Sequence, residues 1–438
     1  MSARVTPAES PALWLVAPFF LAAPAGLAAA GLLLAGANSD SFAGVNLPRN
    51  LAIVHALVVG WVTTTMMGAT YQVIPAVLGG RLWSAALIRL QFGLHICAVP
   101  VFVWAFYRWD LRVLEAGGIM VCASLVLYLF NAGLGLARGS RTGATRAYIL
   151  AALSFLLATG GLGLLWVVAL RHALFTITLD RIAAHAHLGL LGWLGMTVMG
   201  VSYQLVPMFN VVRGTDPRFR RVALVVTVLA VAAFAGVMLS TPPRPVRVTF
   251  AAALAIGPAL WGIDQLRMMH HRSRRKTDVQ GKATYLSLAM LAVTIVLGFS
   301  VLTMQVGAPE TNNTHVVVAY AMSGVLGWMG MMLIGNTYKI LPFLLWYHRY
   351  RPLVGRAPVP VTADIYSDRA ATAVLGSHAV GVALLVVAAL LENTWLLRAS
   401  GVVFVGVGVA HLGTMLHMFL PKTSSRPMAP TTRRAVVQ

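Results

Sequence analysis

The chain consists of long apolar stretches separated by short polar ones. A helix needs about 20 apolar residues to cross a bilayer. The sequence therefore predicts an all-α polytopic membrane protein with twelve transmembrane helices, forming a single domain over residues 1–422. The nearly uncharged stretches cover residues 11–35, 50–79, 85–106, 113–136, 147–170, 182–211, 222–240, 248–266, 283–305, 313–346, 370–390 and 394–420.

Composition agrees with this pattern. Of the 438 residues, 58% are hydrophobic and only 10% are charged, and the mean hydropathy is +0.79. A soluble globular protein carries about a quarter charged residues. The two cysteines, Cys97 and Cys122, lie inside apolar stretches, and the sequence has no CxxCH motif. We therefore expect neither a disulfide framework nor covalently attached c-type haem.

The positive charges are distributed unevenly between the two ends of the predicted helices. The terminal tails and the loops after spans 2, 4, 6, 8 and 10 hold 23 Lys and Arg residues, and the other loops hold 8. Because loops rich in Lys and Arg stay in the cytoplasm, we expect both termini to be cytoplasmic in the cell's inner membrane. We read the basic run 272–276 as part of this bias, so lipid is the expected partner and nucleic acid is not. Residues 423–438 are rich in Ser, Thr, Pro and Arg and are expected to form a disordered cytoplasmic tail.

One pattern, GW-x5-[MI]G-x2-Y[QK]-x2-P, occurs three times, in spans 2, 6 and 10. Its tyrosines are Tyr71, Tyr203 and Tyr338, at offsets of 203 − 71 = 132 and 338 − 203 = 135. Parallel repeats of this kind are related by an axis along the membrane normal. We therefore expect three four-helix repeats, at approximately 11–136, 147–266 and 283–420, around a pseudo-three-fold axis. The proline of each copy is expected to end its helix.

Histidines recur near the outer ends of the repeat spans. His55 and His187 each precede the repeat tyrosine by 16 residues (71 − 55 and 203 − 187). His185 lies two residues before His187, which is about 200° around a helix, so the two rings should face different neighbours. Span 10 has Met322 at the equivalent position and His315 one or two turns further out. An intramembrane histidine is a functional-site candidate by default, and a core histidine bonded to a backbone carbonyl is the alternative.

A second group of histidines lies in the inner half. His378 follows Arg369 by 9 residues and His411 precedes Lys422 by 11, so we expect both at similar depth, where they could share a ligand. His95 and His417 are further inner candidates. A simple hydrogen bond between helices would explain these histidines equally well.

The chemistry of these side chains favours haem iron. The intramembrane histidines have no accompanying cluster of Asp or Glu, which argues against a zinc hydrolase or a di-iron site. Neutral imidazoles facing one another across an apolar bundle suit axial ligation of haem. We therefore expect one or two non-covalent b-type haems.

Twelve spans, a three-fold arrangement of four-helix repeats and outer histidines on spans 2, 6 and 10 resemble subunit I of the haem–copper oxidase superfamily, across the whole membrane region. The resemblance implies haem ligation by His55 and by one of His185 and His187. The other of that pair, with His315, would serve a second haem or an open metal centre. Copper ligands on spans 6 and 7 have no counterpart here, so copper binding is left open. The resemblance thus implies a divergent oxidase-like or nitric-oxide-reductase-like protein, with a quinol or a cytochrome as electron donor.

Two other functions fit the sequence. A proton-coupled transporter would use Lys339 and Asp264, which are rare intramembrane charges. A haem or copper handling protein without turnover would use the methionines at 66–67 and 329–332.

Overall fold

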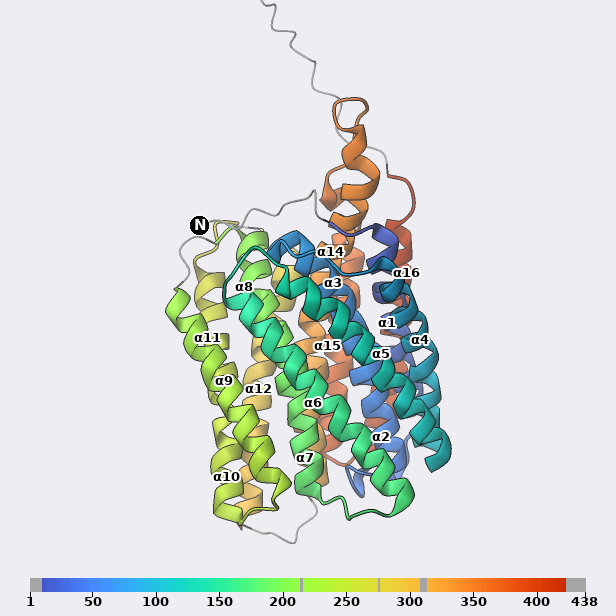
Figure 1. Cartoon of the computed structure of the whole chain (residues 1–438), viewed down its shortest axis with the longest axis vertical. Helices are drawn as coiled ribbons and strands as arrows, with labels where there is room; N and C mark the ends of the chain where they lie inside the picture. The colour runs from blue at the N-terminus through green and yellow to red at the C-terminus, as the bar shows by residue number, and fades with distance from the viewer. Residues whose placement is uncertain (1–9, 213–215, 275, 308–312, 423–438) are drawn as a thin grey trace, which may run out of the picture.

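The computed structural model describes residues 10–212, 216–274, 276–307 and 313–422, and the tail expected at 423–438 lies outside this part of the chain. The molecule is a bundle of long helices (Figure 1). Within the described residues the only β pairing is one isolated bridge, between Val212 and Arg272. In this part of the chain, twelve helical segments are long and apolar enough to cross a membrane, which confirms the expected all-α, twelve-span class.

The helices follow the apolar stretches to within a few residues, and four of the spans are divided into two or more segments. In chain order the main elements are α1 (Leu13–Ala35), α2 (Pro48–His55), η3 (Ala56–Thr63), α3 (Thr64–Leu78), α4 (Ala85–Arg108), α5 (Leu111–Ala137), α6 (Ala144–His172), α7 (Leu179–His187), η4 (Leu188–Gly195), α8 (Met196–Asn210), α9 (Pro217–Leu239), α10 (Arg244–Ala253), α11 (Ile256–His270), α12 (Val279–Gly307), α13 (Thr314–Met322), η5 (Ser323–Met329), α14 (Gly330–Leu345), η6 (Trp346–Tyr350), α15 (Asp368–Leu390) and α16 (Thr394–Met418).

Polar residues in the short loops set where the spans begin. The hydroxyl of Ser84 accepts a hydrogen bond from the Leu87 amide at the start of α4. The carboxylate of Asp110 accepts two amide hydrogen bonds at the start of α5. Asn393 caps α16 in the same way. Each cap satisfies backbone donors that the first helical turn leaves without partners, so successive spans can follow one another after very short loops.

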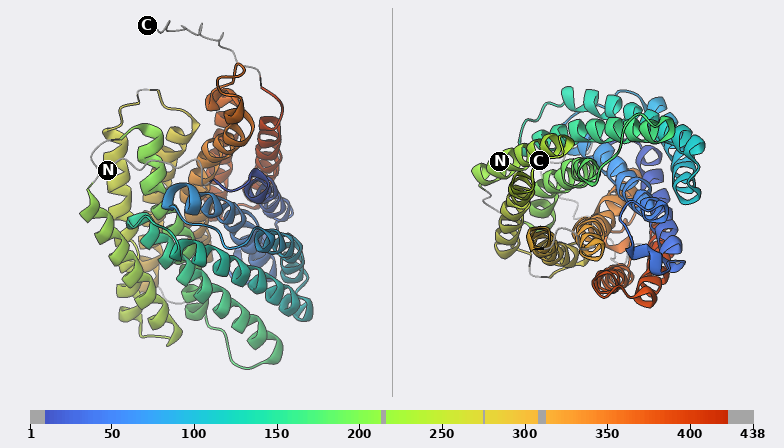
Figure 2. Two further views of the ribbon diagram at one scale, coloured as in Figure 1. Left: turned by 45° about the horizontal axis from the view of Figure 1, so that its top comes forward. Right: turned by 90° about the horizontal axis from the view of Figure 1, so that it is seen from below.

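The three spans that carry the repeated motif lie at the centre of the bundle (Figure 2, right). In the apolar stretch of each of these three spans, 61% to 78% of the residues are buried inside the protein. The corresponding share in the other nine spans is 22% to 50%. Each central span contains a π-helical segment, namely η3, η4 and η5. These segments begin immediately after His55, His187 and Met322, which hold equivalent places in the three copies of the motif.

The tryptophans of the three motifs contact the neighbouring central spans in a cycle. Trp193 of η4 donates its indole N–H to Thr63 of η3, at 3.1 Å. A Cβ atom added at Gly195 would lie 3.3 Å from the Trp328 ring of η5, and one added at Gly330 would lie 2.9 Å from the Trp61 ring of η3. The π-helical segments therefore touch one another pairwise at the centre of the molecule.

The prolines of the motif do not end all three helices, contrary to expectation. Pro75 and Pro207 are each followed by three further helical residues, while helix continues beyond Pro342 through η6 to Tyr350. A proline removes only one backbone donor. Packing of these mostly buried central spans compensates for that loss.

The first and last spans pack closely together. Gly401 of α16 lies against the backbone of α1, where an added Cβ atom would be 2.3 Å from the Ala35 amide nitrogen and 2.6 Å from the Gly31 carbonyl oxygen. Gly408 of α16 lies against Pro24 and Ala28 in the same interface. Small residues permit such close approach of two membrane helices.

We expect Gly401→Ala to lower the free energy of unfolding by about 1–3 kcal/mol, because the added methyl group meets backbone atoms that cannot move away. Thermal unfolding in detergent measures the effect. Gly406→Ala on the same helix is the matched control, since an added Cβ atom there meets nothing within 4 Å. In a helix, Ala is favoured over Gly by about 1 kcal/mol. Equal melting temperatures for the two variants would contradict this account of the interface.

Candidate functional site

His55 is the last residue of α2, where η3 begins. In Figure 1, α2 lies toward the lower end of the bundle. Its Nδ1 atom is 2.7 Å from the carbonyl oxygen of Leu51, one helical turn earlier. The imidazole stacks on Phe106 of α4, with ring centroids 4.5 Å apart, and meets the edge of Phe102 at 5.3 Å. The backbone and two aromatic rings therefore fix the orientation of this histidine.

His187 repeats this arrangement in the next motif copy. Its Nδ1 atom is 2.8 Å from the carbonyl oxygen of Ala183, and its ring meets Phe234 of α9 edge-on at 4.7 Å. The pairs His55–Phe102 and His187–Phe234 have the same sequence separation, since 102 − 55 = 47 and 234 − 187 = 47. The two histidines thus occupy equivalent places, with equivalent partners.

The backbone contact selects one tautomer. An imidazole that donates its Nδ1–H to a carbonyl oxygen keeps a lone pair on Nε2, and histidines that bind metals are commonly oriented by such a hydrogen bond. For His187 the Nε2 atom is already engaged, because the hydroxyl of Tyr320 lies 3.1 Å away and can donate to it. Among the described residues no hydrogen-bond partner contacts Nε2 of His55.

His185 faces a different neighbour from His187, as the two-residue spacing predicts. Its ring lies against α6, where Trp166 is 5.0 Å away between centroids. A Cβ atom at Gly163 would come within 2.8 Å of the His185 ring, so a glycine is needed there. The Nδ1 atom of His185 is buried without a hydrogen-bond partner, and the ring is within electrostatic range of His55. The structure therefore pairs His187 with Tyr320, while His185 contacts α6 and lies within electrostatic range of His55.

His315 stands apart from these residues. Its Nδ1 atom lies 3.2 Å from a carboxylate oxygen of Glu392, without hydrogen-bond alignment, at the end of the bundle that holds the α15–α16 turn.

In the alignment of the motif copies, Tyr320 of span 10 is equivalent to His185 of span 6, since 320 − 185 = 135. Tyr320, Phe102 and Phe234 were not identified from the sequence, although the repeat offsets point to all three.

The inner histidines do not lie at one depth, and this expectation is wrong. His378 contacts Phe404, which precedes His411 by seven residues. Seven residues are two helical turns, about 10 Å along the helix axis. Packing of α15 against its neighbours sets the offset between the two histidines along the helix axes. Counting residues from the charges in the adjacent loops cannot show this offset. The two rings remain within electrostatic range of one another.

The inner histidines also differ in their hydrogen bonds. His378 Nε2 lies 2.8 Å from the Leu326 carbonyl oxygen, while its Nδ1 and both nitrogens of His411 are buried without partners. His95 contacts the hydroxyls of Thr64 and Ser124, at 3.0 and 3.1 Å. His417 lies 2.9 Å from Lys422 at the bundle's end. Because both nitrogens of His95 have protein partners, we interpret His95 as a hydrogen-bonded core histidine and not as a ligand.

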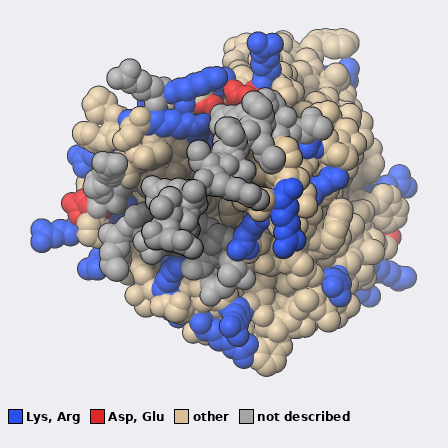
Figure 3. All heavy atoms as spheres, turned by 90° about the horizontal axis from the view of Figure 1, so that it is seen from above, with Lys and Arg blue, Asp and Glu red and all other residues tan. Residues whose placement is uncertain are grey.

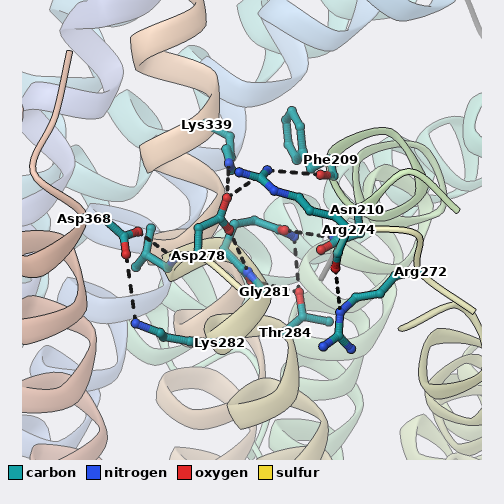
Figure 4. Close-up of polar contacts among 12 residues, drawn as sticks. Phe209, Asn210, Arg272, Arg274, Asp278, Gly281, Lys282, Thr284, Lys339 and Asp368 are labelled. Carbon is teal, nitrogen blue, oxygen red and sulfur yellow. Dashed lines mark hydrogen bonds and ion pairs between the residues drawn. The ribbon is translucent and has the colours of Figure 1, made fainter. Parts of the chain in front are cut away.

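The two intramembrane charges have different surroundings. Lys339, which replaces the glutamine of the other two motif copies, forms an ion pair with Asp278 at the start of α12, and Arg274 binds the same carboxylate at 3.0 Å (Figure 4). Asp264 is buried beside Arg220, and its Oδ2 atom has no hydrogen-bond partner. Of the two, only Asp264 has a polar atom left unpaired.

Comparisons with known proteins leave the chain's family open. No protein-family model and no curated protein matches the sequence. Among the described residues no three side chains of His, Cys, Asp or Glu gather as a ready metal-binding group. We therefore infer the function from the surroundings of the outer histidines.

The Lys339–Asp278 pair makes stability depend on pH. Burial disfavours the charged form of Asp278, but the hydrogen bond and charge of Lys339, together with Arg274, hold the pKa of this carboxyl below its usual value. A carboxyl with a lowered pKa stabilises the folded state above its unfolded pKa, near 4, and this contribution is lost as the pH falls.

We therefore expect Lys339→Gln to cost about 2 kcal/mol of stability at pH 7, the usual range for a hydrogen bond to a charged group. The difference from the wild-type protein should shrink as the pH falls from about 5 toward 3. Melting temperatures across this range test it. Lys282→Gln is the control, since its ammonium is 4.0 Å from Asp368 in an exposed pair. A loss that is constant with pH would rule out the ion pair as its cause.

Proposed function

We propose that this chain is an integral membrane protein that binds non-covalent b-type haem through His55 and His185. Its role would be electron transfer, or redox chemistry of a diatomic gas such as NO or O2, without the copper site of the oxidase family. The observation that carries the proposal is that His55 and His185 lie on neighbouring central spans within electrostatic range of one another, each with a ring nitrogen that lacks a protein partner.

The donor set fits haem iron better than other metals. Two neutral imidazoles in apolar surroundings match the axial ligands of a b-type haem. A buried polar atom without a partner costs about 1–3 kcal/mol, so the unpaired Nδ1 of His185 favours a ligand at this position. Phe102, Phe106 and Trp166 supply aromatic surfaces beside the two histidines. When bound there, haem would supply a one-electron redox centre.

His187 is the candidate for a second centre. It is the equivalent of His55 and has the same backbone contact, but Tyr320 occupies its Nε2 atom. A ligand at His187 would have to displace this hydroxyl. His315, with Glu392 as its partner, contributes less to this proposal than the sequence suggested.

The same proposal includes three four-helix repeats around a pseudo-three-fold axis. The cyclic contacts of Trp61, Trp193 and Trp328, and the two equivalent histidine–phenylalanine pairs, support it. The excess of Lys and Arg at one end of the bundle supports a cytoplasmic location for that end, in the inner membrane. A quinol or a cytochrome is the proposed electron donor.

Asp264 favours a second candidate function, proton-coupled transport. A buried carboxyl with an unpaired oxygen is suited to taking up and releasing a proton. The absorption spectrum of the purified protein separates the two candidates, since a transporter of this kind needs no haem.

We expect the purified protein to contain haem that acid acetone extracts completely, because no CxxCH motif is present for thioether attachment. A pyridine haemochrome assay measures the type and amount. His55→Ala and His185→Ala should each remove the low-spin absorption bands, since each takes away one axial ligand.

His95→Gln is the matched control, because His95 is a buried histidine whose two nitrogens both have protein partners. Its spectrum should equal that of the wild-type protein. A colourless wild-type preparation, or low-spin bands that survive in the double variant of His55 and His185, would refute the proposal.

A further inference from the structure

A cavity of about 410 Å³ lies between α11 and α12, at the end of the bundle where the Lys and Arg residues gather (Figure 3). It is lined by Leu266, Arg267, His270, His271 and Tyr285. Arg267, His270 and His271 are exposed residues in the last turns of α11 and the loop that follows. The cavity is therefore positively charged and accessible from outside the protein.

Below the cavity, the same surface is apolar and faces the hydrocarbon region of a membrane. Ile263 and Leu266 of α11 are about half exposed, and Tyr285, Leu286 and Val296 of α12 are exposed beside them. Both helices belong to segments long and apolar enough to cross a bilayer. A basic cavity thus adjoins an apolar surface that points outward.

Arg267 lines this cavity and Arg272 lies beside it, against the lining residue Tyr285, and neither guanidinium group is held by a carboxylate. Arg267 stacks over Phe219 of α9, at 4.9 Å. Arg272 donates to the Tyr285 hydroxyl and, at 3.0 Å, to the Met269 carbonyl oxygen. Neither arginine forms a salt bridge with any described carboxylate.

The neighbouring carboxylates do not line the cavity. Asp264 lies one turn before Arg267 and is buried; Arg220 is its strongest basic neighbour and Arg267 the next, but Asp264 and Arg267 form no ion pair. Asp278 is bound by Lys339 and Arg274 (Figure 4). An anion in the cavity would therefore meet fixed positive charge without a competing acidic side chain.

We propose that this cavity binds the phosphate group of an anionic phospholipid, whose acyl chains lie along α11 and α12. Basic pockets between membrane helices bind such headgroups, and guanidinium groups match phosphate oxygens in geometry and charge. The adjoining apolar surface selects lipid over free phosphate, because only a lipid gains from covering it.

The test is native mass spectrometry of the delipidated full chain in neutral detergent, titrated with dioleoylphosphatidylglycerol. We expect one tightly bound lipid per chain, and clearly weaker binding of the zwitterionic dioleoylphosphatidylcholine. Arg267→Gln should weaken phosphatidylglycerol binding about fivefold, the effect of one charge near a headgroup. Arg267→Lys should restore most of it, and unchanged melting temperatures show that the variants fold.

Arg138→Gln is the matched control. Arg138 stacks over Trp83, 4.4 Å away, beside a second groove of about 570 Å³ that has no titratable lining residue. Its loss should leave the tight site intact. Equal weakening by both Gln variants would show diffuse charge instead of a site. Equal binding of the two lipids, or displacement of phosphatidylglycerol by millimolar inorganic phosphate, would also overturn the proposal.

Discussion

Every backbone group inside a bilayer needs a hydrogen-bond partner within the protein, and this requirement governs the centre of the molecule. The π-helical segments η3, η4 and η5 interrupt the regular pattern of helical hydrogen bonds, so side chains must reach their carbonyl oxygens. The Thr64 hydroxyl donates to Val59, and His378 contacts Leu326. These two carbonyls are equivalent, because 326 − 59 and 338 − 71 both equal 267. A side chain of the same central span meets this need in η3, and a side chain of α15 meets it in η5.

The π-helical segments also determine how the outer histidines are presented. Each segment adds a residue to one turn, which rotates the side chains before it relative to those after it. His55 and His187 lie immediately before such segments, while the motif tryptophans lie inside them. A single central span can therefore direct its tryptophan toward the bundle axis and its histidine toward the flanking spans. This local irregularity separates a packing centre from a candidate ligand site on the same helix.

The sequence predicted the class of fold well and the pairing of side chains less well. Apolar length determines whether a helix can span a membrane, so the twelve spans could be located to within a few residues. The repeat spacing was enough to predict that His55 and His187 occupy equivalent places. The relative depth of His378 and His411 could not be predicted from the sequence, because helix packing sets how far neighbouring spans are shifted along one another. In the sequence, Lys339 is an isolated intramembrane charge, but in the structure it forms an ion pair with Asp278. The sequence could not show this pair, because contacts between a loop and a span depend on the tertiary structure.

The close contact between α1 and α16 has a consequence for synthesis of the protein. This interface joins α1, which leaves the ribosome before the other described spans, to α16, which leaves it after them. Until α16 enters the bilayer, the Gly31 surface of α1 must face lipid or a chaperone instead of its partner. The free energy of this interface is thus gained only after the described spans before α16 have been inserted. A chain that stops before α16 has an open seam along α1, which membrane quality control can recognise.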